Sequence, residues 1–357
     1  MRNFCVLGLI FLLSMTAGRA ADQNMALNCP VEVSPAPNYT LTGNDAKSLT
    51  DGEFTAGFFW TQKTTVGWMY QKYAAITIDL GRVQSISGAS FNTAAGASDV
   101  GWPECIVMLA SDDKQTWRYI GDLVELSAGN PPPADGYSTH RYVTHHVATH
   151  GRYVLFAVST YGVYVFCDEV EVFAGPDEYL GPTYAGEVVA SESVLMANQR
   201  TRSGIKRRLT DDLTAVDKAV KASNISDADK RELRARMIAI AADTVSRPMP
   251  EAEKFRAVYP ITTEHARIFN VYSSVLRSKG LPSLVVWKKN RYDYSSPLDL
   301  PIVTSALPSV GISMMRNEFR SDALLLTNTA DKPVRVSLGF DKLPGAPKPE
   351  WLGVYSV

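Results

Sequence analysis

The sequence predicts a mainly β protein of several domains, in which a β-sandwich is followed by a helical region and then by a second, smaller β-sandwich. Three observations support this order. Apolar and polar residues alternate between Ala75 and Leu80, apolar residues recur at helical spacing from Leu209, and strand patterns return at Leu284. The chain has 357 residues, 45% of them hydrophobic, which is enough to bury cores for two or three domains.

The N-terminus predicts secretion. Arg2 is followed by a short apolar stretch from Phe4 to Met15, and small residues precede Ala21. A charged start, an apolar segment and small residues at the cleavage position are typical of a signal peptide. This stretch of about 12 residues is shorter than the roughly 20 that a membrane-spanning helix needs. We therefore expect a signal peptide at residues 1–20 and a soluble, extracellular or periplasmic chain without a membrane span.

The first half of the chain shows strand patterns. In residues 75–80 the apolar side chains Ile76, Ile78 and Leu80 alternate with polar ones, as in a strand with one buried face, and Gly81 is expected to end it. Residues 105–110 are apolar on both faces, which is typical of a central strand covered by a second sheet. Residues 154–158 and 170–172 repeat the alternation, and no helical pattern interrupts the series.

Residues 176–280 predict helices instead. Apolar residues recur at helical spacing from Leu209 to Val220 and again from Leu233 to Thr244, which predicts an antiparallel helical hairpin. Ser226, three residues before Asp229, resembles a capping box at the start of the second helix. A third helix is expected from Thr262 to Gly280. In it His265 heads an apolar face, where a packed or capping role fits better than metal binding.

Strand patterns return over residues 281–357. The segments 284–287 and 302–303 are followed by 323–327 and 334–338, and the last two are expected to form a hairpin through residues 328–333. Residues 316–328 and 343–345 resemble the all-β domain that precedes the barrel in bacterial hexosaminidase-like glycoside hydrolases. A catalytic barrel of that kind needs about 200 to 250 residues of alternating strand and helix, and the remaining sequence does not contain them.

Composition and motifs argue against nucleic-acid binding and against the common catalytic sites. The formal net charge of -1 gives no basic bias toward nucleic acid, so no nucleic-acid partner is expected. The chain lacks the common hydrolase, zinc-protease, phosphate-loop and paired-cysteine motifs. The adjacent acids Asp168 and Glu169 point to opposite faces of a strand and cannot flank one glycosidic bond. We therefore expect no catalytic residue in this chain.

Five short segments occur in a fixed order along residues 25–175. They are Leu49-Thr50-Asp51-Gly52, residues 76–81, Ser111-Asp112-Asp113 with Trp117, Arg152-Tyr153-Val154, and residues 168–172. Together they resemble a discoidin domain, the coagulation factor 5/8 type C module of the galactose-binding-like class. The resemblance implies a jelly-roll β-sandwich over residues 25–175 whose loops bind glycans or cell surfaces. In such modules Trp117 and Arg152 are structural.

The same resemblance implies a structural calcium ion where the 49–52 loop meets the acidic start of the last strand. Asp51 and Glu169 match those positions. Calcium takes roughly six to eight oxygen ligands, among them carboxylates and main-chain carbonyls. We therefore expect Asp51, Glu169, the hydroxyl of Thr55 and carbonyls of residues 46–51 as ligands. In the alternative, Asp51 only caps a turn and Glu169 is solvated.

A glycan site would require exposed aromatic side chains in loops, because the C–H faces of sugars stack on flat rings beside a few polar groups. Trp102 and Tyr161 are the better exposed candidates, and Trp68, Tyr70 and Trp60 lie in the loops richest in aromatic residues. Trp60 and Trp68 precede a strand at a place where relatives bury an aromatic residue, so each is either core or contact. No arginine and histidine pair near these aromatics forms an obvious galactose clamp.

The cysteines leave two possibilities open. Cys5 lies in the predicted signal peptide, and Cys29, Cys105 and Cys167 remain. Many relatives of discoidin type join their chain ends by a disulfide, which would here pair Cys29 with Cys167. Three buried thiols that pack as small apolar groups are the alternative.

The sequence thus predicts a secreted, non-catalytic protein that docks on a glycan or polysaccharide. Its predicted domains are residues 25–175, 176–280 and 281–357. Two alternatives remain: the non-catalytic N-terminal portion of a glycoside hydrolase, with a linked catalytic domain as its partner, or a structural surface protein without a ligand. An exposed aromatic cluster with polar groups around it would favour docking.

Overall fold

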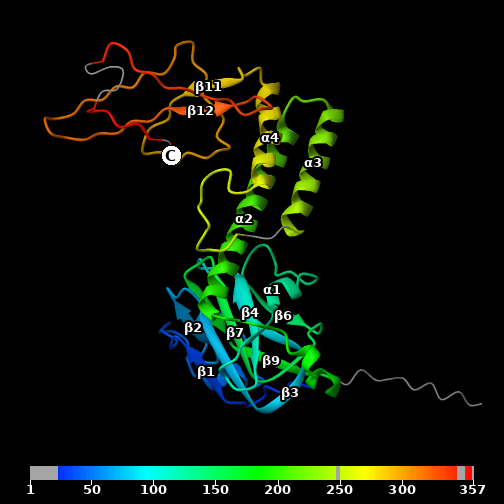
Figure 1. The fold of residues 1–357 in the computed structure, drawn as a ribbon. Helices are drawn as coiled ribbons and strands as arrows, with labels where there is room; N and C mark the ends of the chain where they lie inside the picture. Colours follow the sequence, from blue (N-terminus) through cyan, green and yellow to red (C-terminus); the bar gives the residue numbers. More distant parts are fainter. Residues whose placement is uncertain (1–22, 247–249, 344–349, 356–357) are drawn as a thin grey trace, which may run out of the picture. The chain divides into compact units, whose positions relative to one another are not determined.

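Strand β3, Ala74–Ala95, contributes to both layers of a β-sandwich in the first part of the chain (Figure 1). The computed structural model describes residues 23–246, 250–343 and 350–355, and the chain divides into two compact units at residues 203 and 204. The signal peptide predicted at residues 1–20 lies outside the described residues. None of the helices within them is both long and apolar enough to cross a bilayer.

The two layers share β3 because that strand changes neighbours along its length. Its first residues pair with β1 (Val31–Ser34) and β7 (Thr149–Thr160), and its last residues pair with β6 (Ser138–Thr144) and β9 (Glu169–Ala174). The register with β7 shifts between Asp79 and Gln84, where Gly81 has a φ of +78°. Gly81 was expected to end the strand. It instead allows an irregular segment through which β3 continues.

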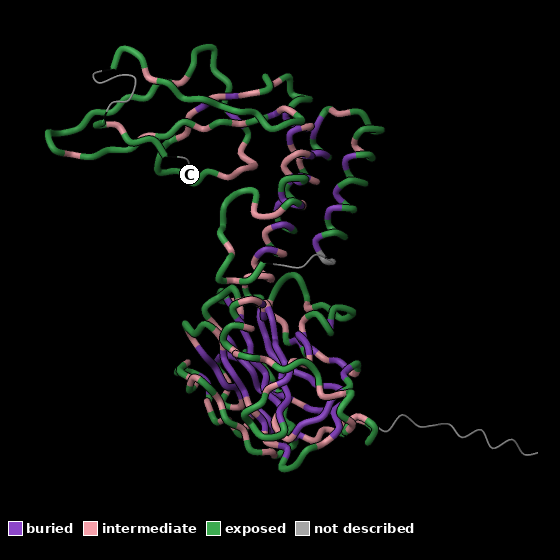
Figure 2. The backbone as a smooth tube through the Cα atoms, in the orientation of Figure 1, coloured by how far each residue is buried: buried purple, intermediate pink, exposed green. Residues whose placement is uncertain are grey.

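The remaining strands complete an all-antiparallel sandwich. Beyond β7 the first layer continues through β4 (Pro103–Ser111), β5 (Arg118–Asp122) and β10 (Glu187–Val188). The strands β2 (Val66–Met69) and β8 (Tyr164–Cys167) form a separate pair. Ile76, Phe156 and Ile106 of the first layer share one buried cluster with Phe91 and Val170 of the other strands. Figure 2 shows this interior as the largest buried region of the unit. The predicted jelly-roll-like sandwich is therefore the fold of the first unit.

Short helices lie between these strands. One turn of α-helix, α1 (Leu123–Leu126), follows β5 directly, although the sequence pattern predicted no helix there. Asp122 caps it by accepting a hydrogen bond from the amide of Val124. Four 3-10 turns occupy Ala46–Leu49, Phe59–Thr61, Asp177–Leu180 and Pro182–Tyr184.

Strand β4 is buried on both faces, as its apolar sequence predicts. One face belongs to the sandwich core. The other carries Cys105, Val107 and Leu109, which pack with Met196 and Leu195 from the first turns of helix α2 (Glu192–Ala222). This helix begins well before the helical pattern recognised in the sequence, and the boundary between the two units falls within it.

The second unit is built on three helices. The C-terminal part of α2 packs with α3 (Asp227–Ser246) and α4 (Thr263–Ser278) around apolar residues of the predicted periodic faces: Leu209, Val216, Val220, Leu233, Met237, Ile240, Ile268, Val271 and Val275. Ser226 caps α3 through the amide and carboxylate of Asp229. Thr262 caps α4 through the amide of His265. His265 is fully buried, as expected for a packing residue.

The strands of the second unit pair differently from the prediction. Strand β12 (Leu325–Asn328) pairs antiparallel with β11 (Leu284–Trp287), and not with residues 334–338, which form no strand. Thr329 extends this pairing, because its amide donates to the carbonyl of Ser283 and its hydroxyl to that of Pro282. Among the described residues the second unit thus holds one two-stranded sheet, whereas a small sandwich was predicted. Val334, Val336 and Leu338 are exposed, so these residues bury no apolar face that would stabilise a strand.

The three cysteines of the first unit are free thiols, so the disulfide between Cys29 and Cys167 does not form. Cys167 is fully buried and Cys29 packs at the edge of the same core, where its thiol donates to the carbonyl of Met25. The alternative reading, in which the thiols act as small apolar groups, is the one that the structure adopts.

Candidate functional site at an aromatic end of the sandwich

Three loops that are far apart in the sequence meet at one end of the sandwich. The amide of Tyr70, after β2, donates to the carbonyl of Val163, after β7, at 2.8 Å. Gly162 lies against the loop before β4, since a Cβ at this position would come within 3.3 Å of the Asp99 carbonyl. We call this region, formed by residues 70–73, 96–102 and 160–164, the loop end.

A layer of packed aromatic rings lies beneath the loop end. Phe59, Trp60 and Phe166 are buried there, with Tyr39, Trp102, Tyr137 and Tyr164 half-buried around them. Tyr39 meets Phe166 edge to face at 4.9 Å, and Tyr164 stacks on Phe166 at 6.0 Å. Such contacts between rings add to the burial of apolar area. The loops therefore rest on a rigid aromatic base.

The predicted glycan contacts fall into two groups. Tyr70 and Tyr161 are 73% and 41% exposed, and Trp102 is half-buried. Trp60 is 8% exposed, and Trp68 is fully buried in the core with its indole N–H donating to the carbonyl of Pro35. A buried ring has no face to offer a sugar. Tyr70, Tyr161 and Trp102 thus belong to loops whose backbones meet, whereas Trp60 and Trp68 are core residues.

Backbone strain marks the same loops. Tyr70, Ser98 and Asp99 have φ values of +57°, +53° and +59°, in the left-handed region that side chains rarely adopt. Each such residue costs of order 1 to 3 kcal/mol and persists only where surrounding contacts hold it. The hydrogen bond of Tyr70 to Val163 is one such contact. A large exposed ring on a strained backbone is a candidate functional residue.

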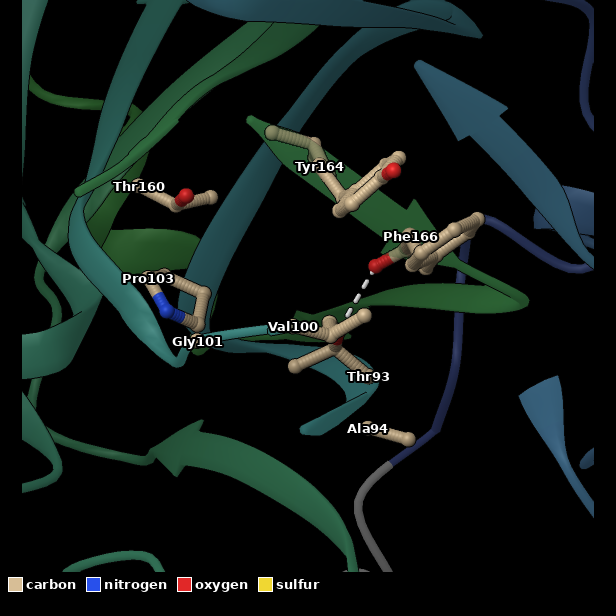
Figure 3. A pocket seen from close by; sticks show the side chains of 9 residues that line it. Thr93, Ala94, Val100, Gly101, Pro103, Thr160, Tyr164 and Phe166 are labelled. Atoms are coloured by element: carbon tan, nitrogen blue, oxygen red, sulfur yellow. Dashed lines mark hydrogen bonds between the residues drawn. The ribbon is translucent and has the colours of Figure 1, made fainter. Parts of the chain in front are cut away.

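A shallow depression lies within the loop end (Figure 3). It is lined by Thr93, Ala94, Val100, Gly101, Pro103, Thr160, Tyr164, Val165 and Phe166, and its volume is about 180 Å³ including open solvent. The hydroxyl of Thr93 donates to the carbonyl of Phe166, whereas the buried hydroxyl oxygen of Thr160 has no hydrogen-bond partner. The depression has no room for a water molecule, so it is not a pocket that could enclose a ligand.

Sequence reasoning missed a further exposed ring beside the loop end. Phe58 is 52% exposed and lies 4.5 Å from the ring of Tyr137, which also contacts Trp60 edge to face. The hydroxyl of Tyr137 joins this turn by accepting from the amide of Phe59 and donating to the carbonyl of Gly57. Tyr137 follows the turn pair Asp135-Gly136, the only local signal that could have drawn attention to it.

The predicted calcium ligands lie at a second location. One carboxylate oxygen of Glu169 accepts a hydrogen bond from the amide of Gly52 at 3.1 Å, and the other is buried without a hydrogen-bond partner. The pKa of Glu169 is raised to about 8, mainly by burial and also by the nearby charges of Asp51, Glu171 and Asp168, against the opposing effect of the Gly52 amide. Asp51 lies near Glu169, but its carboxylate accepts a hydrogen bond from the amide of Glu53 at 2.9 Å and so caps a turn, as in the alternative expectation. Glu169 is buried and not solvated, unlike in that alternative.

Thr55 lies with different partners. Its hydroxyl contacts the hydroxyls of Thr64 and Thr65, and its amide donates to Asp168 at 2.6 Å. Within the described residues no three side chains of histidine, cysteine, aspartate or glutamate gather closely enough to hold a metal. An ion at Glu169 would therefore depend on main-chain carbonyls together with the two carboxylates, a donor set that suits calcium better than transition metals.

Asp168 and Glu169 do not form an exposed pair of acids. Asp168 is fully buried and accepts hydrogen bonds from the amide of Thr55 and the side chain of Asn92. Arg152 has a structural role, as expected, because its guanidinium makes two hydrogen bonds of 2.8 Å to Asp79 on the neighbouring strand. Trp117 is half-buried against the outer cluster that contains Cys105 and Met196.

No protein-family model and no curated protein matches the chain. Among solved structures, CpGH89CBM32-6 from Clostridium perfringens aligns over 43% of this chain and 100% of its own, with 18% identity and a TM-score of 0.29. Chitosan-binding module 1 of a chitosanase/glucanase from Paenibacillus sp. IK-5 aligns over 43% and 99%, with 18% identity and a TM-score of 0.27. A fucose-binding module of Streptococcus pneumoniae aligns over 43% and 96%, with 15% identity and a TM-score of 0.29. The fold of the first unit rests on the strand pairing described above and not on these alignments.

Proposed function

We propose that the loop end binds a glycan, and that the chain is a secreted, non-catalytic protein docked by this contact. The observation that carries the proposal is the exposed pair Tyr70 and Tyr161 on contacting loops over a packed aromatic base. Exposed rings on a rigid support stack on the apolar faces of sugars at little cost in side-chain entropy. One weak site suffices for docking, because a tether raises the effective concentration.

Polar groups of the same loops support this ligand class. Gln71, Lys72, Ser98 and Asp99 are exposed around the aromatic residues and offer donors and acceptors to sugar hydroxyls. Solved structures that align with the chain are described as binding fucose, chitosan or chitotriose, and GalNAc-β-1,3-galactose. We propose a glycan as the ligand class of this chain and name no particular sugar.

A glycan array with the purified chain tests the proposal, followed by calorimetry on the strongest ligand. Tyr70→Ala and Tyr161→Ala should each weaken binding at least about fivefold, since loss of an aromatic contact costs on the order of 1 kcal/mol or more. Tyr292→Ala is the matched control, because this tyrosine of the second unit is 86% exposed. No signal on any glycan, or unchanged binding by both loop variants, would contradict the proposal.

Secretion has its own test. Cleavage of the predicted signal should leave an exported protein whose N-terminus lies near Ala21. Intact-mass analysis of protein recovered from the periplasm or the medium measures this directly. Retention of residues 1–20 in the exported protein, or its absence from both fractions, would contradict the proposal.

A second candidate function, as the non-catalytic portion of a glycoside hydrolase, has support from the second unit. Residues 288–343 carry many exposed apolar side chains, among them Leu307 at 83% and Phe319 at 98% exposure. Apolar surface of this extent is typical of a segment that packs against another domain. In either case the chain alone should not hydrolyse glycosides, and sustained turnover of chromogenic glycosides by the purified chain would contradict both.

A further inference from the structure

Residues 127–137, which follow α1, contact the loop end at two points and the neighbouring strand β6 at a third. The indole N–H of Trp102 donates to the carbonyl of Pro133 at 3.1 Å. The backbone of Asn130 hydrogen-bonds to the ring of His140. The backbone of Gly136 lies against Gly96, where a Cβ would come within 1.9 Å of the Gly136 carbonyl. We call residues 127–137 the strap.

The two ends of the strap are anchored, because the amide of Ser127 donates to the carbonyl of Leu123 and the hydroxyl of Tyr137 bonds to Phe59 and Gly57. Its middle is stiff. Pro131, Pro132 and Pro133 fix their own φ angles, so this segment moves as one piece. The prolines also lack N–H groups, so few hydrogen bonds hold the middle of the strap. The closed position of this middle, residues 130–133, depends on the groups that meet it, Trp102 and His140.

His140 is a buried histidine with one unsatisfied nitrogen. It lies on β6, is 8% exposed, and meets the rings of Trp102 and Tyr142 edge to face at 5.7 and 4.6 Å. Its Nε2 is buried and has no hydrogen-bond partner. The bond between the ring and the backbone of Asn130 therefore involves the other ring nitrogen, Nδ1, which donates to the Asn130 carbonyl and so raises the pKa of His140. A proton added to Nε2 would create a buried N–H without an acceptor, which costs more than an ordinary unsatisfied group because the ring is then charged.

No charged side chain among the described residues contributes to the pKa shift of His140, so a charge on its ring stays uncompensated. The paired segment of β3, Ala89–Ala95, has no ionisable side chain. Burial lowers the pKa of His140, and the bond to Asn130 offsets this only in part.

We propose that the strap is a pH-sensitive cover of Trp102, which is closed while His140 is neutral and opens when His140 takes up a proton. Opening breaks the contacts to Asn130 and Pro133 and lets water reach the ring of His140. Because the open state binds the proton more tightly than the closed state, closure is fully stable above the ordinary histidine pKa of about 6.5 and weakens as the pH falls below it.

Hydrogen exchange of the full chain tests this without any ligand. Protection factors, corrected for the intrinsic pH dependence of exchange, are compared at pH 7.5 and 5.0. Peptides from the strap should lose protection at least about fivefold at pH 5.0, while peptides from β4 keep theirs. Equal strap protection at both values, or an equal loss in β4, would overturn the proposal.

Two variants separate His140 from other titrating groups. His140→Phe keeps a buried ring that cannot take up a proton, so the strap of this variant should show the same protection at both pH values. His146→Gln is the control, because His146 is exposed near the end of the same strand, and its strap should open like that of the unchanged chain. A pH-dependent strap in His140→Phe would overturn the proposal.

The consequence for ligand binding rests on the proposed function. If the loop end binds a glycan, exposure of Trp102 should change the affinity between pH 7.5 and 5.0, and His140→Phe should remove that part of the change. A chain that binds no glycan at either pH would refute the proposed function and would leave the exchange result unaffected. The two proposals therefore fail separately.

Discussion

Glu169 accepts a hydrogen bond from the amide of Gly52 at 3.1 Å through one carboxylate oxygen, and this bond joins the start of β9 to the loop that carries Asp51. The second oxygen is buried without a partner. A buried carboxylate in this state is stabilised either by a proton or by a cation, because the charged form alone has lost its hydration. Both possibilities lead to measurable consequences.

The first prediction concerns the metal-free protein. The pKa of Glu169 is about 8 in the folded chain, above its ordinary value of 4.5. The folded state therefore holds the proton more tightly, and the free energy of unfolding falls as the pH rises from 4.5 through 8. Glu169→Gln should remove this fall. In chelator, unfolding by denaturant at pH 6.0 and 8.5 should show the variant gaining about 1 to 3 kcal/mol on the unchanged chain over this interval. Parallel pH dependence in both would contradict the prediction.

The second prediction concerns calcium. If the ion replaces the proton, calcium at about 100 times its Kd should stabilise the folded chain by about 2.7 kcal/mol, which corresponds to several degrees in Tm. Binding should strengthen as the pH rises toward 8, because the proton must leave first. Thermal melts in calcium and in chelator measure the effect. Glu169→Gln should lose it, and Asp99→Asn, which alters an exposed carboxylate of the loop end, should keep it. An unchanged transition in excess chelator would exclude the ion.

The third prediction separates binding from stability at Tyr70. Its backbone has a φ of +57°, which glycine adopts without strain, so Tyr70→Gly should leave the stability unchanged or raise it by about 1 kcal/mol. The same change removes a 73% exposed ring and should weaken glycan binding at least about fivefold. Denaturant unfolding and calorimetry measure the two effects. Tyr70→Phe should bind nearly as well as the unchanged chain. A glycine variant that loses stability and keeps full binding would show that the ring supports the fold.

Much of the sandwich could be predicted because its strands carry their pattern locally. The alternation of Ile76, Ile78 and Leu80 and the apolar run of residues 105–110 correspond to buried positions of β3 and β4. Gly81 shows the limit of such reasoning. A glycine after an alternating run is compatible with a strand end and with an irregularity inside a longer strand, and only the pairing of β3 with β6 and β9 decides between them.

The strand that pairs with β12 in the second unit could not be predicted from the sequence. Leu325, Leu326 and Thr327 have a strand pattern that fits pairing with either neighbour along the chain. Their actual partner is β11, about 40 residues earlier, and the contact depends on Trp287, whose indole N–H donates to the hydroxyl of Thr327 at 2.9 Å. A long-range pairing of this kind leaves no local signal.

Only part of the candidate site could be predicted, because exposure, like strand pairing, depends on contacts that are distant in the sequence. Aromatic residues in loops indicated which end of the sandwich to consider, but exposure depends on packing between loops. Trp68 and Tyr70 are two residues apart, and one is fully buried whereas the other is 73% exposed. Strand alternation would place both on one face, but the left-handed backbone at Tyr70 turns the chain away after β2.

The second unit contains a buried polar network around Asp212. The same oxygen of Asp212 lies 2.7 Å from Nε2 of His265 and 2.8 Å from Nε of Arg208. The other ring nitrogen of His265 accepts from the amide of Ile261, so the neutral ring donates to the carboxylate. Burial lowers the pKa of His265, and the carboxylate of Asp212 offsets this in part. These contacts join α2 to the start of α4, with His265 fully buried.

The fourth prediction follows from this burial. Asp212→Ala leaves the N–H of His265 without an acceptor and Arg208 without its carboxylate partner, and removal of one member of a buried pair costs about 3 to 5 kcal/mol. Asp217→Ala is the control on the same helix, because Asp217 pairs with Lys221 and Arg234 at the surface, where such pairs contribute about 1 kcal/mol or less. Denaturant unfolding followed by the helical signal measures both. Since the folded state disfavours the imidazolium, the stability of the unchanged chain should also fall as the pH drops below about 6.5, and His265→Leu should lose that part of the pH dependence. Equal costs at Asp212 and Asp217 would show that the buried network contributes no more than a surface pair.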